Sequence, residues 1–472
     1  MSEDKKAMQN RESSKHPSER NPAPIGLASR AQMKGEKMKQ YQRKVQLGKI
    51  FLRFVKSESF SGVFLFISMV LALLVANSGL SSLYFSFWNM DFGFVFNDKF
   101  VGFDMQSWVN DVLMSFFFLM VGLEIKREFL TGELSGLQKA AFPVLAAIGG
   151  MIAPAIIYTG LNMGSASVHG FGIPMATDIA FALGVVLMLG KRVPFALKVF
   201  LVTLAVVDDL GAIVVIAVVY TSEILWGYLG VAGGIVAVLV LLNRFGVKSL
   251  YPYLILGVLL WLAFHESGVH ATISAVILAF CIPLQAKESK SSFITTIKSA
   301  IENFYQRQTR EWGSKQGGML KNLYKKSQDT QSPLEYLEHK LHPWSAYFIM
   351  PLFAFANAGV AVGSGIDFGI DHIFLGVLLG LFVGKPLGIF LITFICAKLK
   401  IATKPRELSW LHIFGAGMLS GIGFTMSIFV SNLAFDNEQA IEVAKVAILF
   451  ASFLSAVCGS TLLFVFDKLK SK

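Results

Sequence analysis

Charged residues are scarce in this chain: they make up 15% of its 472 residues, against about 25% in an ordinary soluble domain. Hydrophobic residues make up 54%. A chain this apolar has too few polar side chains to cover a surface that faces water. The composition therefore excludes a soluble globular protein and predicts a fold surrounded by lipid.

Cysteine is also rare, and the three that occur, Cys281, Cys396 and Cys458, all lie in apolar stretches. In such surroundings cysteine behaves as a small hydrophobic side chain, which excludes a disulfide framework or a cysteine metal cluster. The start of the chain lacks the apolar core of a cleavable signal peptide. We therefore expect the first spanning helix to direct membrane insertion.

Long apolar runs begin at Phe60, and most are close to the ~20 residues that a helix needs to span a bilayer. There are about twelve, which predicts an all-α polytopic membrane protein. The boundary between the seventh and eighth is the least distinct. The runs cover residues 60–78, 107–124, 140–160, 171–190, 196–220, 224–242, 250–264, 268–284, 343–362, 371–397, 409–433 and 441–466.

The net charge of +11 is not spread as in a nucleic-acid-binding protein, and we expect no nucleic-acid partner. Lysine and arginine gather in both tails and in every second connection between the apolar runs. By the positive-inside rule, this alternation predicts that both termini are cytoplasmic. The predicted organisation is a basic cytoplasmic tail, a transporter domain and a short C-terminal tail, at residues 1–57, 58–467 and 468–472.

Two connections are unusual. Residues 79–106 contain phenylalanines that alternate with small or aliphatic residues before the turn-forming pair Asn97-Asp98. This pattern predicts an extracytoplasmic β-hairpin, although an aromatic belt at the membrane interface is the alternative. Residues 285–341 form a long cytoplasmic connection of mixed charge, with an amphipathic helix expected near 292–310. We find no chemistry in that connection.

The charges inside the apolar runs are the main functional signal, because each costs at least ~2.5–3.5 kcal/mol at mid-membrane. Asp208 and Asp209 are adjacent in the middle of the fifth run, and Lys385 is in the middle of the tenth. The fourth run carries Thr177 and Asp178. A structural salt bridge is the alternative, but one lysine cannot neutralise three acids. At least one acid is therefore left to bind a proton or a cation.

Two other acids in the second run have simpler explanations. Glu124 lies beside Lys126, Arg127 and Glu128, which favours a solvated or salt-bridged face. Asp111 lies near the outer end of the same run, where it could cap the helix.

Glycine and proline interrupt two of the apolar runs at mid-membrane depth. The fourth run contains Gly172 and Pro174, and the eleventh contains Gly421, Gly423 and Thr425. Runs three to five and ten to twelve form equivalent triplets of opposite direction. Paired broken helices in an inverted repeat point to the binding site of a secondary transporter. Close helix packing is an alternative explanation for the two glycines of the eleventh run.

Eight motifs, distributed over most of the runs, make the chain resemble the NhaA family of Na⁺/H⁺ antiporters. Members of this family are themselves known inverted-repeat transporters, so the two arguments are not independent. The resemblance extends over residues 57–466. The motifs are 108–111 (WVND), 122–128 (GLEIKRE), 176–184 (ATDIAFALG), 208–213 (DDLGAI), 267–272 (SGVHAT), 351–359 (PLFAFANAG), 384–388 (GKPLG) and 421–427 (GIGFTMS).

The resemblance implies a bacterial inner-membrane antiporter that exports Na⁺ or Li⁺ against inward protons, electrogenically and by alternating access. It implies no cofactor, and a homodimer joined through the outer hairpin. Asp208 and Asp209 would bind Na⁺ and protons, with Thr177 as a further ligand. Lys385 would pair with Asp208, and Asp178 would balance the helix ends.

The resemblance also implies pH regulation at the cytoplasmic rim, which carries over to Glu124. His270 is a second candidate for pH sensing. A packed interface histidine is the simpler interpretation of His270. Two departures from the family pattern bear on regulation: the connection 285–341 is longer, and Glu266 stands where some members carry a basic residue.

Three other functions compete with antiport. A sodium-coupled solute symporter would need a polar and aromatic solute cavity, a channel would need rings of acids or carbonyls, and a membrane enzyme would need spaced histidine, cysteine or serine groups. The sequence contains none of these patterns, and we expect no enzymatic activity.

Overall fold

The structure is a computed structural model that describes residues 58–96, 99–221, 224–286, 290–306, 314–361 and 371–470. The chain divides into two units, residues 1–57 and 58–472. The predicted basic tail and the predicted Asn97-Asp98 turn lie outside the described residues. The second unit carries all the candidate site residues.

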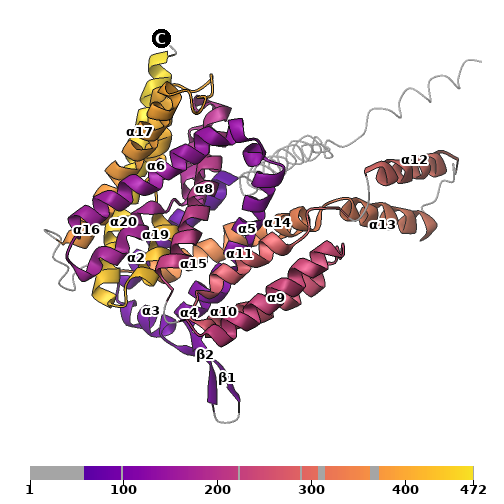
Figure 1. Cartoon of the computed structure of the whole chain (residues 1–472), viewed down its shortest axis with the longest axis horizontal. Helices are drawn as coiled ribbons and strands as arrows, with labels where there is room; N and C mark the ends of the chain where they lie inside the picture. Colours follow the sequence, from indigo (N-terminus) through magenta and orange to yellow (C-terminus); the bar gives the residue numbers. More distant parts are fainter. Residues whose placement is uncertain are drawn as a thin grey trace, which may run out of the picture. The chain divides into compact units, whose positions relative to one another are not determined.

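The first half of this unit is helical apart from one pair of strands (Figure 1). Its elements are α2 (Glu58–Ala76), α3 (Ser81–Trp88), β1 (Asp91–Phe96), β2 (Lys99–Asp104), α4 (Met105–Ser107), η1 (Trp108–Leu113), α5 (Met114–Leu130), η2 (Glu133–Ser135), α6 (Leu137–Leu161), η3 (Ala166–Met175), α7 (Ile179–Met188), η4 (Gly190–Arg192), α8 (Phe195–Val219), α9 (Trp226–Arg244), α10 (Leu250–Ser267) and α11 (Ala271–Cys281).

In the second half, all the regular elements of the described residues are helices. Three of the short elements, η1, η5 and η6, are π-helical, whereas η2, η3 and η4 are 3₁₀ helices. The elements are α12 (Lys290–Gln306), α13 (Ser314–Asp329), α14 (Pro333–Trp344), η5 (Ser345–Ile349), α15 (Met350–Asn357), α16 (His372–Leu379), η6 (Gly380–Gly384), α17 (Lys385–Lys398), α18 (Trp410–Ser420), α19 (Phe424–Ala434) and α20 (Glu438–Lys470).

Eight helical spans of the described chain are long and apolar enough to cross a membrane, and two bent helix pairs raise the number to ten. Helices satisfy their own backbone hydrogen bonds, which is why lipid-embedded apolar runs adopt this form. The prediction of a polytopic helical membrane protein is confirmed. The count of twelve stays a prediction, because α11 is shorter than a span requires and the helical stretch around residues 343–362 is not among the candidate spans.

Local sequence signals set several helix boundaries. Gly268 ends α10 with a φ of +82°, a conformation that favours glycine. Ser332 begins α14 and Ser409 begins α18; each serine accepts a hydrogen bond from the backbone N–H three residues on.

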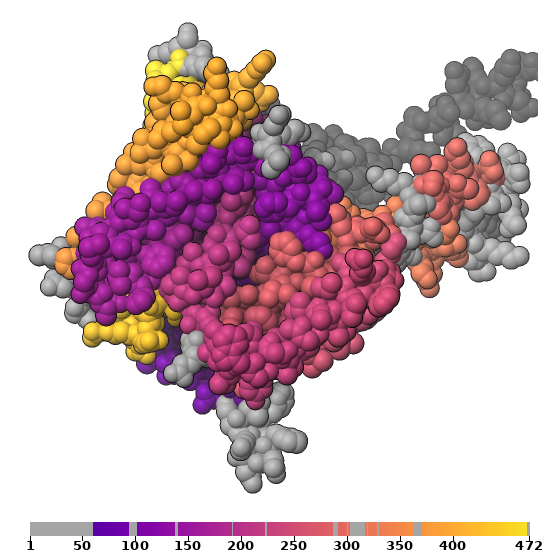
Figure 2. Space-filling model, in the orientation of Figure 1, coloured from indigo at the N-terminus to yellow at the C-terminus, as the bar shows by residue number. Residues whose placement is uncertain are grey.

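Small residues allow two pairs of helices to pack backbone against backbone. A Cβ atom on Gly149 of α6 would lie 2.3 Å from the Gly388 carbonyl of α17, and one on Gly388 would lie 2.1 Å from the Gly149 carbonyl. Gly62 of α2 and Gly184 of α7 meet in a similar way. Close approach through small residues is the usual device for packing helices within a membrane. The α6 and α17 surfaces are continuous in Figure 2.

The connection between α2 and η1 holds a short helix as well as a hairpin. β1 pairs antiparallel with β2, with Asp91 opposite Asp104 and Phe96 opposite Lys99. Helix α3 was not expected from the sequence. It is held by Tyr84, which is buried and donates its hydroxyl proton to the Phe355 carbonyl of α15.

The long connection contains three helices where one was expected. The helix predicted near residues 292–310 corresponds to α12, which covers Lys290–Gln306 of the described residues. Helix α13 was missed because its sequence is strongly polar. Helix α14 was missed as well, although Ser332 and Glu335 form a capping box, which is a sequence signature of a helix N-terminus.

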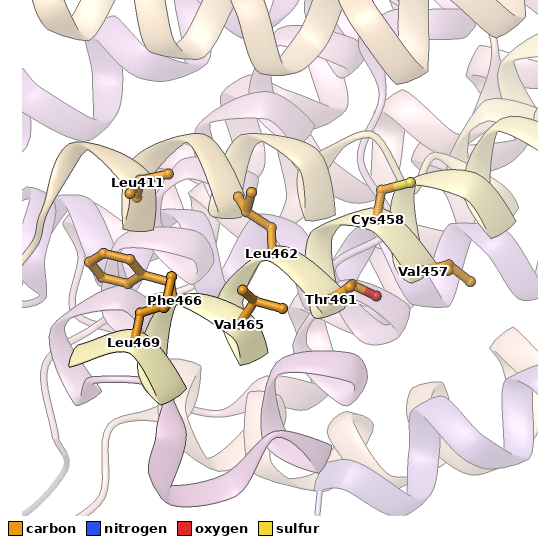
Figure 3. Close-up of a pocket in the computed structure, with 8 residues that line it drawn as sticks. All are labelled: Leu411, Val457, Cys458, Thr461, Leu462, Val465, Phe466 and Leu469. Atoms are coloured by element: carbon orange, nitrogen blue, oxygen red, sulfur yellow. The ribbon is translucent and has the colours of Figure 1, made fainter. Parts of the chain in front are cut away.

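An open groove lies between α18 and α20, away from the buried charges. Its volume is about 580 Å³, and the side chains that line it are almost all apolar, as the close-up shows (Figure 3). An exposed apolar surface of this kind suits contact with lipid chains. The lining residues are Leu411, Val457, Cys458, Thr461, Leu462, Val465, Phe466 and Leu469.

Candidate ion-binding site

Two interrupted helical stretches meet inside the bundle. Residues 176–178 are extended and separate η3 from α7, while the axes of α18 and α19 differ by 48°. The Asp178 backbone N–H donates to the Ile422 carbonyl, at 2.7 Å, which joins the two breaks directly. Backbone groups freed by one interruption are thereby satisfied by the other.

Asp178 is fully buried at the N-terminal ends of two helices. Its carboxylate accepts hydrogen bonds from the Phe181 N–H of α7, at 3.0 Å, and the Thr425 N–H of α19, at 3.1 Å. The Thr425 hydroxyl is a third donor. Helix N-termini carry partial positive charge, so this carboxylate is balanced by two helix dipoles and three hydrogen bonds.

Lys385 is fully buried at the start of α17. Its Nζ lies 3.0 Å from Asp208 Oδ2 and donates to the Met175 carbonyl at the end of η3. Helix C-termini carry partial negative charge. The lysine is therefore paired with one carboxylate and one helix end, and the structure contains the Lys385–Asp208 pair that the resemblance implied.

Thr177 ties Asp208 to the second break. Its Oγ1 lies 2.7 Å from Asp208 Oδ2 and 3.1 Å from the Ser420 carbonyl at the end of α18. A hydroxyl has one proton to donate and two lone pairs. It can donate to either oxygen and can accept from a protonated Asp208.

Asp209 has no comparable partner among the described residues. It is 1% exposed, none of the ion pairs described includes it, and its Oδ1 lacks a hydrogen-bond partner. Asp208 Oδ1, on the preceding residue of α8, is also buried without a partner. A buried carboxylate without a counter-charge is costly unless it binds a proton or a cation.

The other predicted site residues are packing elements of the breaks. Pro174 lies in the last turn of η3, and the Gly172 N–H donates to the Tyr220 hydroxyl, at 3.2 Å. Cβ atoms on Gly421 and Gly423 would lie 2.5 Å from the Leu381 carbonyl and 2.1 Å from Ser427 Oγ. The close-packing interpretation therefore describes both of these glycines.

The charge of Glu124 acts on Asp209, whereas His270 contacts Tyr220 outside this cluster. Glu124 is half-buried on α5. His270 precedes α11 and its Nε2 lies 2.7 Å from the Tyr220 carbonyl, a packed interface contact. Asp111 lies within η1, and the carboxylate that caps the start of this segment, at α4, is instead Asp104, which accepts a hydrogen bond from the Ser107 N–H.

A second charged cluster links α5 to α14. Arg127 Nε lies 3.1 Å from Glu338 Oε2, and another Arg127 nitrogen lies 3.1 Å from Glu128 Oε1. Burial raises the pKa of Glu338 above its usual range, although the Arg127 guanidinium acts in the opposite direction. Glu338 was not among the predicted site residues, because α14 was not expected from the sequence.

Four amide side chains tie α19 to the segment before α5. The Asn357 amide of α15 receives a hydrogen bond from Gln106, at 3.1 Å, and another from Asn432, at 3.0 Å, and it donates to Asn110, at 2.8 Å. These amides are neutral and satisfy one another's hydrogen bonds, so the cluster holds the segments together and is not a site for a charged ligand.

The chain is similar to known proteins over most of its length. The model of the Na⁺/H⁺ antiporter 1 family matches residues 52–463. The chain is 59% identical, over 420 residues, to the Na(+)/H(+) antiporter NhaA of Helicobacter pylori strain HPAG1, a match that covers 88% of this chain and 95% of the relative.

Two further relatives come from other species. The Na(+)/H(+) antiporter NhaA 2 of Helicobacter hepaticus is 57% identical over 425 residues, which is 89% of this chain and 96% of the relative. The Na(+)/H(+) antiporter NhaA of Wolinella succinogenes is 55% identical over 427 residues, covering 90% and 94%. These matches extend over nearly the full length of each relative. The chain belongs to the Na⁺/H⁺ antiporter 1 family.

Proposed function

We propose that this Na⁺/H⁺ antiporter exports Na⁺, and also Li⁺, from a bacterial cell by binding cations and inward-moving protons alternately at Asp209 and Asp208. Family membership gives the exchange reaction and a transporter in place of an enzyme; a sodium-coupled symporter finds no support among the relatives. The observation that carries the assignment is the buried, unpaired carboxylate of Asp209.

Competition for the same oxygens explains the exchange. Na⁺ is a hard cation that takes oxygen ligands, as Ca²⁺ and Mg²⁺ do. Asp209, Asp208 and Thr177 Oγ1 can supply them. A bound cation excludes the proton and a bound proton excludes the cation. If the site reorients across the membrane only when occupied, one ion must move inward for the other to move outward.

Lys385 and Asp178 keep the rest of the site neutral. Asp178 is balanced by two helix N-termini and Lys385 by Asp208 and a helix C-terminus. Asp209 is therefore the carboxylate whose negative charge has to be neutralised by the transported ion. We propose that the exchange is electrogenic, because protonation of Asp208 releases Lys385 to exchange its own proton.

The deciding experiment for this function uses inverted membrane vesicles in which respiration has acidified the lumen. Addition of Na⁺ or Li⁺ should dissipate the pH gradient, and addition of K⁺ should leave it unchanged. A gradient that responds equally to all three cations would contradict selective antiport. A gradient that responds only when an organic solute is added would favour symport.

The orientation in the membrane follows from the distribution of lysine and arginine. We propose that both termini are cytoplasmic and that the β1–β2 hairpin lies outside, where it joins two copies into a homodimer. In a chain without its native cysteines, Ser165→Cys should react with an impermeant thiol reagent added to whole cells. Gln331→Cys should react only after the membrane is opened. The reverse pattern would refute the orientation.

We also propose that the Arg127–Glu338 cluster gives the protein part of its pH response, beside Glu124 and His270. Arg127, Glu128, Glu335 and His339 are the charged or titratable groups that act on Glu338. Loss of its proton as the pH rises creates the ion pair with Arg127, which couples α14 to α5.

The stability of a Glu338→Gln variant tests this cluster. Because the pKa of Glu338 is raised in the folded protein, its ionisation opposes folding. The wild type and the variant should match in acid, and the wild type should lose melting temperature relative to the variant as the pH rises from the ordinary glutamate range through the raised pKa. The matched control is Glu133→Gln, on the surface. A difference that is independent of pH would contradict the assignment.

A further inference from the structure

The α12 and α13 helices form an antiparallel hairpin. Lys326, late in α13, donates to the Thr296 hydroxyl, early in α12, at 3.0 Å, and the two helices pack together (Figure 1). Phe293 and Ile297 of α12 and Leu323 of α13 are half-buried. These residues define the side that each helix turns toward the other.

Each helix keeps a second apolar face that nothing in the described structure covers. On α12, Ile294 is 53% exposed and Ile301 is 51% exposed; on α13, Leu320 is 42% and Tyr324 is 67% exposed. At about 100° per residue, each pair lies roughly a quarter-turn from the side that meets the other helix. This rotation has the same sense on both helices when each is viewed from its own N-terminus. Because the helices run in opposite directions, the two pairs fall on one common side of the hairpin.

Lysines border this apolar side. Lys298 stands between Ile294 and Ile301 along α12, and Lys321 and Lys325 follow Leu320 and Tyr324 along α13; all three are exposed. The sequences of the two helices contain six lysines against two acids, Glu302 and Asp329. An apolar strip with cationic edges is the pattern of a helix that lies in a membrane interface.

The hairpin is tethered close to membrane-spanning helices. Eight residues, 282–289, connect it to α11, and three, 330–332, connect it to α14. At about 3.6 Å per residue the longer connector reaches no more than about 29 Å. Helix α14 in turn packs against α5, and its Leu334 and Leu337 are buried. The bilayer surface is therefore always within reach of the exposed side.

We propose that the α12–α13 hairpin docks on the surface of the surrounding bilayer and binds anionic phospholipid headgroups. Ile294, Ile301, Leu320 and Tyr324 enter the headgroup region, while Lys298, Lys321 and Lys325 reach the phosphates. Charge complementarity selects anionic over zwitterionic lipid, and the apolar strip distinguishes the interaction from simple attraction of counter-ions. This inference is independent of the ion-binding site.

The test uses the full chain, without its native cysteines, in nanodiscs of phosphatidylcholine with or without phosphatidylglycerol. An environment-sensitive fluorophore is attached to Ile294→Cys or Tyr324→Cys. The matched control is Ser299→Cys, which is exposed but lies about 140° around α12 from Ile294. We expect a blue shift and a several-fold gain in emission at positions 294 and 324 in anionic discs only, and none at 299.

Charge reversal separates lipid binding from other contacts. The pair Lys298→Glu with Lys321→Glu should abolish the anionic-lipid response at position 294. The pair Lys340→Glu with Lys398→Glu, which changes the net charge equally outside the hairpin, should preserve it. An equal response at 294 and 299, or one that is the same in zwitterionic discs, would overturn the proposal. A response that requires two protein copies in one disc would assign the face to a second copy instead.

Discussion

Asp209→Asn is expected to abolish Na⁺-driven proton exchange, to the level of vesicles that lack the protein, without lowering stability. Asparagine retains the shape of the side chain but can neither release a proton nor neutralise a cation. Because Asp209 has no described ion-pair partner, removal of its charge leaves no other buried charge uncompensated. The measurement combines exchange in inverted vesicles with the melting temperature of the purified protein.

The neighbouring aspartate provides the contrast. Asp208→Asn should also abolish exchange, but it leaves Lys385 buried without its partner at 3.0 Å. Loss of one member of a buried pair typically costs about 3–5 kcal/mol, so this variant should melt well below Asp209→Asn. Asp104→Asn, a carboxylate outside the site, is the control for exchange. If either variant kept wild-type exchange, the assignment of the changed residue to the ion-binding site would be wrong.

Lys385→Ala is expected to destabilise the protein by about 3–5 kcal/mol, because it strands the Asp208 carboxylate in the interior. The Met175 carbonyl loses its donor at the same time. In the double variant with Asp208→Asn, the second change should recover much of the stability lost in the first. A double variant no more stable than Lys385→Ala alone would contradict the pairing.

Lys385→Arg separates structural from transport roles. Arginine keeps the positive charge but does not release a proton in a protein. If Lys385 is a counter-ion only, reconstituted Lys385→Arg should carry the same current per Na⁺ as the wild type. If the lysine carries a transported proton, this variant should be slow or should carry less charge per cycle. The measurement is transport current set against Na⁺ flux in the same proteoliposomes.

The sequence predicted the residues of the site better than it predicted their contacts. Asp208, Asp209 and Lys385 could be singled out because each places a charge in an apolar run, where a charge is costly. Composition and position did not distinguish the two aspartates, and only the family resemblance implied that Lys385 pairs with Asp208. The distinction depends on the direction in which Lys385 reaches across from α17, and tertiary packing sets that direction.

The backbone carbonyls that contact the site residues could not be predicted from the sequence either. The Met175, Ser420 and Ile422 carbonyls complete the site, yet a carbonyl belongs to every residue and leaves no compositional signal. Among the helices, α13 escaped prediction because polar residues outnumber the apolar ones that mark its faces. The interface of α14 with α5, and with it the role of Glu338, depended on a helix that was not expected.

The glycine seam between α6 and α17 constrains how the protein can change shape. At Gly149 and Gly388, a carbonyl oxygen of one helix occupies the space that a side chain of the other helix would otherwise fill. Sliding at this contact would drive backbone into backbone, and a backbone carbonyl cannot move aside as a flexible side chain can. The two helices must therefore turn as one body. A covalent cross-link along the seam would leave turnover intact, whereas a cross-link from this body to α5 would arrest it.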